Sequence, residues 1–199
     1  VQLLPSLDPG ITLLDIEADR GVPVIHSLVL DELLVSDGPA FWVDANVYAT
    51  TTSFARLAPS MRLLDRIHVA RGFTAYQHYG AVSSIPDAVK RSIRTATRSE
   101  ADTHPESGRD SDGNGTPSIL VAPAIDAPYR SEDALGEEQA ETLLTRSLAE
   151  LTAIADTYDI PVLLTRTTRR PQTTPIERAA TQHLTCESTR MGPRFGVDV

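Results

Sequence analysis

A short apolar segment between two prolines constrains the fold of this chain more than any other feature. Residues 118–122, Ser-Ile-Leu-Val-Ala, are mostly aliphatic, and Pro117 and Pro123 stand on either side of them. A run of this length and composition is typical of a strand that is buried on both faces, as the strands of parallel sheets are. The pattern predicts a central strand over residues 118–122, followed by a loop of the kind in which the chemistry of α/β proteins gathers.

The rest of the chain alternates between strand-like and helix-like patterns. Apolar runs and alternation predict further strands over residues 11–16, 40–44, 66–71, 160–165 and 183–188. Helical spacing predicts helices over residues 24–35, 51–64, 75–96 and 134–158, with a break at Pro59 and a kink or division at Pro86. Together these elements predict an α/β fold with three layers, in which a mainly parallel sheet is flanked by helices. The length suits a single domain over residues 1–199.

The balance of charged residues is unusual. The formal net charge is -9, and Lys90 is the only lysine among the 18 basic residues. Such a composition is typical of a salt-adapted, halophilic protein, and an ordinary acidic cytosolic protein is the alternative. The lone Cys186 excludes an intramolecular disulfide and a cysteine-based zinc site. Because no apolar run approaches about 18 residues and no signal-like start is visible, we expect no membrane segment and a cytoplasmic location.

Residues 98–116 contain no aliphatic side chain larger than alanine. This stretch is rich in Asp, Glu, Ser and Gly and cannot bury enough apolar surface to order itself, so we predict a disordered acidic loop over residues 98–116. A regulatory or metal-binding loop that uses His104, Asp110 and Asp112 is the alternative.

Three segments resemble the core of RecA/RadA-type recombinases and their paralogues. Residues 66–78, Arg-Ile-His-Val-Ala-Arg-Gly-Phe-Thr-Ala-Tyr-Gln-His, resemble a strand of that family and the ARAFN..HQ segment that follows it. Residues 41–44 resemble the strand that ends at the family's catalytic glutamate. Residues 119–130, which end in Tyr-Arg, and residues 143–164 resemble the segment from the metal-binding strand to the next core strand.

This similarity covers about residues 11–165 and implies a RecA-like fold of the P-loop NTPase class, but the catalytic positions do not follow. A phosphate loop needs glycines, a lysine and a hydroxyl residue to hold a Mg²⁺-bound triphosphate. The equivalent loop here contains Asp15, Glu17, Asp19, Arg20 and Gly21. The glutamate position falls at about Asn46 and the metal-side aspartate position at about Pro123, and neither residue can replace the lost group. The resemblance therefore implies a pseudo-ATPase of halophilic-archaeal type that uses no cofactor and no metal.

The C-terminal segment, residues 166–199, is locally basic in an acidic chain. Its arginines are Arg166, Arg169, Arg170, Arg178, Arg190 and Arg194, opposed only by Glu177, Glu187 and Asp198. Recombinases place a DNA-contacting loop after the equivalent strand, so the resemblance implies DNA, a recombinase-type protein or both as partners of these arginines. Arginine also binds phosphate in a bidentate way. Ordinary surface ion pairs are the alternative.

The preferred hypothesis is a non-catalytic, RecA/RadA-like accessory protein in DNA recombination or repair. One alternative is a metal-dependent hydrolase or nuclease of altered chemistry that uses Asp44 and Asp126. The other is a structural module that forms homo-oligomers through its arginine-rich surface. We also predict that the cluster around His78 caps a helix against the core, the alternative being that it stacks on nucleic-acid bases.

Overall fold

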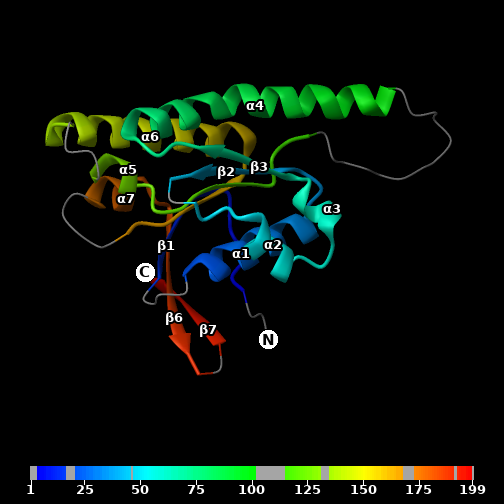
Figure 1. The fold of residues 1–199 in the computed structure, drawn as a ribbon, viewed down its shortest axis with the longest axis horizontal. Helices are drawn as coiled ribbons and strands as arrows, with labels where there is room; N and C mark the ends of the chain where they lie inside the picture. Colours follow the sequence, from blue (N-terminus) through cyan, green and yellow to red (C-terminus); the bar gives the residue numbers. More distant parts are fainter. Residues whose placement is uncertain are drawn as a thin grey trace.

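Seven strands form a single sheet in the order β3-β2-β4-β5-β1-β6-β7 (Figure 1). The structure is a computed structural model that describes residues 4–16, 21–45, 47–101, 115–130, 135–167, 173–190 and 192–198. The strands are β1 (Gly10–Ile16), β2 (Ala40–Asp44), β3 (Ile67–Arg71), β4 (Ile119–Ala122), β5 (Pro161–Leu164), β6 (Gln182–Thr189) and β7 (Gly192–Asp198). All neighbouring strands are parallel except β7, which runs antiparallel to β6.

The segment between the two prolines is the strand β4, and it lies inside the sheet. It pairs with β2 on one side and with β5 on the other, and all four of its residues are buried. A strand with two strand neighbours and helices over both faces exposes no side to water, which explains its continuous apolar composition. The prediction of a buried central strand is therefore confirmed.

Helices cover both faces of the sheet (Figure 1). One layer holds α1 (Gly21–Val35), α2 (Thr51–Leu57) and α3 (Met61–Leu64), and the other holds α4 (Ala75–Ala101), α5 (Ala127–Arg130), α6 (Glu137–Tyr158) and α7 (Thr174–Ala179). Successive strand residues point to opposite faces, so Phe41 and Val43 join the core under α4 and α6, whereas Trp42 joins the core under α1. The predicted α/β fold, with a mainly parallel sheet between helical layers, is confirmed. Among the described helices, each is too short or too polar to cross a lipid bilayer.

α4 is longer than its sequence predicts. It continues as one helix through Pro86 and ends at Ala101, so the predicted loop over residues 98–116 is wrong for its first four residues. A proline in a helix interior removes one backbone hydrogen bond, but Val82, Ile85 and Val89 on the same helix are buried against the sheet and hold it in place. Residues 102–114 of the predicted loop lie outside the described residues.

The C-terminal segment holds more regular structure than the sequence predicts. It contains α7 and the hairpin of β6 and β7, of which only a strand over residues 183–188 is predicted. β7 is poor in the residues that favour strands, since it contains Gly192, Pro193 and Gly196, and it is ordered by pairing with β6 along its whole length. Gly192 begins β7 with a φ of +117°, which other residues rarely adopt.

Candidate functional site

The carboxyl ends of the parallel strands meet at one edge of the sheet, where α/β proteins bind their ligands. β1 ends at Ile16 and α1 begins at Gly21, so a strand and a helix flank the predicted nucleotide loop, with Gly21 as the first helical residue. Four of the predicted residues at this edge lie outside the described residues, namely Glu17, Asp19, Arg20 and Asn46. The described residues of this edge that carry carboxylates are Asp15 of β1, Asp44 of β2 and Asp126 in the turn after β4.

Asp15 of β1 is held by an arginine that the sequence assigns to partner binding. Arg166 donates from Nε to Asp15 Oδ1 over 2.7 Å and from Nη2 to the second oxygen of the same carboxylate. A third bond, 2.5 Å long, joins Arg166 Nη1 to Glu177 Oε1 on α7. Burial would lower the pKa of Arg166, but the hydrogen bonds to Asp15 and Glu177 outweigh it and raise that pKa. Only 2 % of the Arg166 side chain is exposed, so its guanidinium is committed to bonds inside the protein.

Asp44 ends β2 and is completely buried. Its Oδ1 accepts a hydrogen bond from the backbone N–H of Tyr48 over 2.9 Å, and its Oδ2 accepts one from the N–H of Ala49 over 3.2 Å. Arg71, at the end of the adjacent strand β3, places its Nε 3.5 Å from Oδ2. The carboxylate thus fixes the chain after β2, and a cation neutralises its charge.

Asp126 stands in the turn after β4 and is equally enclosed. Both of its oxygens accept hydrogen bonds from Thr167, one from the backbone N–H over 2.8 Å and one from the hydroxyl over 2.7 Å. Arg130, one turn further along, places its Nε 3.0 Å from Oδ2. Asp126 therefore ties the turn after β4 to the chain that leaves β5.

These bonds weigh against the metal-dependent hydrolase. A divalent cation needs carboxylate oxygens that point at a shared position, yet both oxygens of Asp44 and both of Asp126 already accept hydrogen bonds. Throughout the part of the chain that the structure describes, no group of three or more His, Cys, Asp or Glu side chains is placed to hold a metal ion.

Pro123 stands directly after β4, where the resembled family carries its metal-side aspartate. It begins a buried turn over residues 123–126, in which Ala124 adopts a φ of +49°. The Ala124 N–H donates to Thr165 Oγ1 over 2.8 Å, and the Ile125 N–H donates to the Thr165 carbonyl over 3.0 Å. The turn is thus bonded to the end of β5, and the residue at the tip of β4 offers neither a carboxylate nor a backbone donor.

His78 lies on the buried side of α4. Its Nδ1 is 2.8 Å from Tyr129 Oη, which in turn is 2.7 Å from Ser147 Oγ, so three helices meet in one chain of hydrogen bonds. Burial lowers the pKa of His78 to about 4, although the negative charge of Asp44 raises it in part. Burial also raises the pKa of Tyr129 to about 12. The prediction that this cluster packs against the core holds for His78 and Tyr79, whereas Tyr76 and Gln77 are exposed.

The edge strand β3 is open on the side away from β2. At its ends the ladder to β2 uses even-numbered positions, since Ala40 N–H donates to Arg66 O over 2.9 Å and Gly72 N–H donates to Asp44 O over 3.1 Å. Because backbone groups alternate in direction along a strand, Ile67, Val69 and Arg71 turn their N–H and C=O groups outward. No other described strand pairs with this side of β3.

A hollow of about 520 Å³ lies between β3 and α4. Its floor includes Phe41 of β2 stacked against His68 of β3, with ring centres 5.2 Å apart. α4 supplies the opposite wall through Ile85 and Ala88, and Arg91 lies on the same wall. The hollow is large enough for one or two apolar side chains and adjoins the outward backbone groups of β3.

The predicted C-terminal arginines do not form one surface. Arg166 is buried, and Arg169 and Arg170 lie outside the described residues. Arg178 belongs to α7, whereas Arg190 follows the far end of β6 and Arg194 lies on β7 opposite Glu187. β6 has eight residues at about 3.3 Å each, so about 26 Å of strand separates Arg178 from Arg190. Figure 1 shows the hairpin of β6 and β7 projecting away from the helices.

Sequence reasoning missed both the open edge and a cationic face of α4. Arg91, Arg94 and Arg98 follow one another at intervals of three and four residues, which places them on one side of a helix. That spacing was visible in the sequence, but the helix was predicted to end at residue 96. The hollow could not be predicted, because it depends on β3 being the last strand of the sheet.

Comparison with known proteins gives no family. The chain matches no protein-family model, and no curated protein matches it.

Proposed function

We propose that this chain is a non-hydrolysing protein of RecA-like fold that acts as an accessory in DNA recombination or repair by binding a recombinase-type partner. The observation that carries the proposal is that Asp15, Asp44 and Asp126 are each bonded to arginine or backbone groups inside the protein. The parallel sheet between helical layers, and the succession of β1 by α1, support the RecA-like part of the proposal.

Nucleotide hydrolysis would need groups that hold Mg²⁺ and neutralise the charge on the γ-phosphate. To serve a metal, Asp44 would have to release Tyr48 and Arg71, or Asp126 would have to release Thr167 and Arg130. Both carboxylates are buried, and leaving a buried acceptor without its hydrogen-bond donor costs about 1–3 kcal/mol. The edge is therefore organised to hold the fold together rather than to bind a metal triphosphate.

A protein that keeps this fold but does not hydrolyse nucleotide acts by binding a partner. The open side of β3 is a surface on which a partner can bind. Its outward N–H and C=O groups can pair with an extended segment of another protein, which is a common mode of peptide recognition. Val69 on the strand is 39 % exposed and Phe73 just after it is 56 % exposed, so apolar area is present beside the backbone groups. The hollow next to β3 would receive an apolar side chain of the added segment.

Charge favours a partner segment that also carries a carboxylate. Arg91 lies in the wall of the hollow and is exposed, whereas Arg71 is already bonded to Asp44 and to the Ala49 carbonyl. A segment with an apolar residue for the hollow and an acidic residue beside Arg91 fits this arrangement. The proposed partner is therefore a recombinase-type protein that presents an extended, acidic and apolar segment to β3.

Val69→Pro tests this proposal. Proline removes the outward N–H at residue 69 but leaves the ladder to β2, because that ladder uses the even-numbered residues. We expect Val69→Pro to weaken binding of a purified RecA/RadA-type recombinase by about tenfold or more in calorimetry, since at least one intermolecular hydrogen bond is lost. Val69→Ala, which keeps the N–H, is the matched control and should bind within about twofold of the parent protein. The proposal fails if the parent protein does not bind the recombinase, or if Val69→Pro binds as the parent does.

A further inference from the structure

Three turns of α4, residues 89–98, carry four cations and no carboxylate. Residues 89–98 include Lys90, Arg91, Arg94 and Arg98 but no Asp or Glu, in a chain with a formal net charge of -9. Lys90 lies 3.4 Å from Asp87 on the preceding turn. Arg91, Arg94 and Arg98 make no ion pair with any residue that the structure describes. We refer to these three residues as the α4 arginine row.

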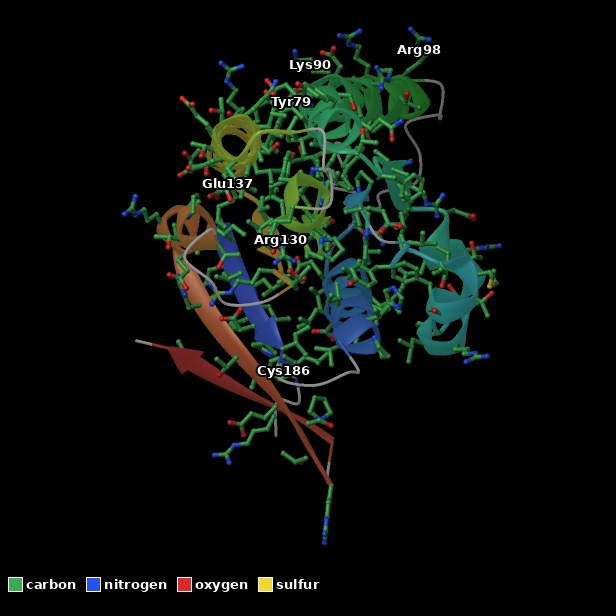
Figure 2. All side chains as sticks on the ribbon, turned by 60° about the vertical axis from the view of Figure 1, so that its left-hand side comes forward. Tyr79, Lys90, Arg98, Arg130, Glu137 and Cys186 are labelled. Carbon is green, nitrogen blue, oxygen red and sulfur yellow. The ribbon has the colours of Figure 1, made fainter. Side chains whose placement is uncertain are left out.

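The α4 arginine row lies on the exposed side of α4, and its first member, Arg91, also borders the hollow between β3 and α4. The opposite side of the same turns packs against the returning chain, because a Cβ added to Gly115 would lie 2.7 Å from the Ser92 carbonyl oxygen and 2.9 Å from the Ala96 side chain. All three arginines of the row are exposed. Figure 2 shows Lys90 and Arg98 on the outer side of α4, where nitrogen-tipped side chains extend away from the sheet.

Structural roles do not account for this row. Other arginines of the chain stabilise the fold. Arg66 donates to backbone carbonyls, Arg130 pairs with Asp126 and Arg166 pairs with Asp15. The helix dipole favours a cation such as Arg98 in the last turn of α4, but its effect falls off within that turn. Arg91 and Arg94 lie one to two turns further back.

We infer that the α4 arginine row binds the sugar–phosphate backbone of a nucleic acid, an inference that rests on the proposed role in DNA recombination or repair. The guanidinium fork matches the oxygens of a phosphate, and a row of arginines along a helix tracks a linear array of them. From Arg91 to Arg98 the helix rises by about 10 Å, which is the axial length of about three nucleotides in one strand of B-form DNA.

The acidic remainder of the protein does not oppose this contact at high salt. At about 1 M salt the screening length falls to about 3 Å, so carboxylates elsewhere on the surface are screened while arginines that touch a phosphate still act. The row contacts backbone rather than base edges, so it binds without sequence preference. The inferred nucleic-acid contact therefore lies on α4 and not on the C-terminal segment, for which the sequence predicts it.

The test is a salt titration with labelled DNA of random sequence, single-stranded and duplex. The variant is Arg91→Gln/Arg94→Gln/Arg98→Gln, which keeps helix propensity and removes three charges. The control is Arg178→Gln/Arg190→Gln/Arg194→Gln, which removes three charges from the predicted C-terminal surface. Thermal unfolding followed by circular dichroism verifies that both variants keep the parent's fold.

We expect the α4 variant to bind weakly and to reduce the slope of log K against log salt by about 2 to 3, because each neutralised phosphate contributes about 0.9 on duplex DNA. The control variant should keep the parent's slope and affinity. The inference is overturned if the parent binds neither form of DNA, if the α4 variant binds like the parent, or if the control variant alone loses binding. It is also overturned if polyglutamate, an acidic polypeptide probe, binds the row as tightly as DNA does.

Arg91 belongs to both surfaces, but the outcomes are separable from those of the proposed function because recombinase and DNA are titrated separately. Val69→Pro changes the edge of β3 and leaves the α4 arginine row intact, so it should bind DNA as the parent does. Recombinase binding without DNA binding removes the inference alone. DNA binding without recombinase binding removes the proposed partner alone.

Discussion

The guanidinium of Arg166 donates hydrogen bonds to both carboxylate oxygens of Asp15, and this contact joins the carboxyl ends of the neighbouring strands β5 and β1. In a nucleotide-binding α/β protein, this edge would face the phosphates. Here a carboxylate and an arginine neutralise one another at the same place. The contact therefore ties the ends of two strands together and occupies the Arg166 guanidinium inside the protein.

Arg166→Ala should destabilise the protein by about 2–4 kcal/mol, because it removes the cation that Asp15 and Glu177 share while both carboxylates are more than two-thirds buried. Urea unfolding followed by circular dichroism measures the change in free energy. Arg178 of α7 makes no ion pair with any residue that the structure describes. Arg178→Ala should therefore change stability by less than about 0.5 kcal/mol. Equal stability of Arg166→Ala and the parent protein would contradict the structural role of Arg166.

The sequence predicts the layers of this fold. It does not predict which side chains are bonded to one another at the carboxyl ends of the strands. The apolar runs at β4 and β5 were readable because strands buried on both faces need aliphatic residues throughout. Arg166 was predicted to contact DNA, since a local list of charges cannot show that Asp15, 151 residues away, lies on the adjacent strand. β7 was missed for a related reason, because its order comes from pairing with β6 rather than from its own composition.

His78 should make the protein less stable in acid. Its pKa is about 4 in the folded protein and 6.5 in the unfolded chain, so the unfolded chain binds the extra proton between these values. The contribution of neutral His78 is complete above about pH 6.5 and is lost as the pH falls toward 4, up to about 3 kcal/mol. His78→Gln should remove this part of the acid sensitivity, so that the stability difference between parent and variant shrinks with falling pH. A difference that stays constant from pH 7 to 4 would exclude this role.

Arg66 should be required for the junction between α1 and β2. Its guanidinium donates to the Leu33 carbonyl over 2.8 Å and to the Ser36 carbonyl over 2.6 Å, and it also donates to Gly38 O. These acceptors lie at and just after the end of α1, where helix carbonyls have no partner in the helix. Arg66→Lys should cost about 2 kcal/mol in urea unfolding, because one ammonium group cannot reach all three carbonyls. A loss below about 0.5 kcal/mol would show that water replaces the arginine.

Calorimetric titration of the protein with ATP and Mg²⁺, together with an assay for phosphate release, tests the central claim most directly. The bonds at Asp15, Asp44 and Asp126 predict no saturable, Mg²⁺-dependent binding and no release of phosphate above the uncatalysed rate. Saturable binding of the metal nucleotide with turnover that is lost in Asp126→Ala would contradict the account.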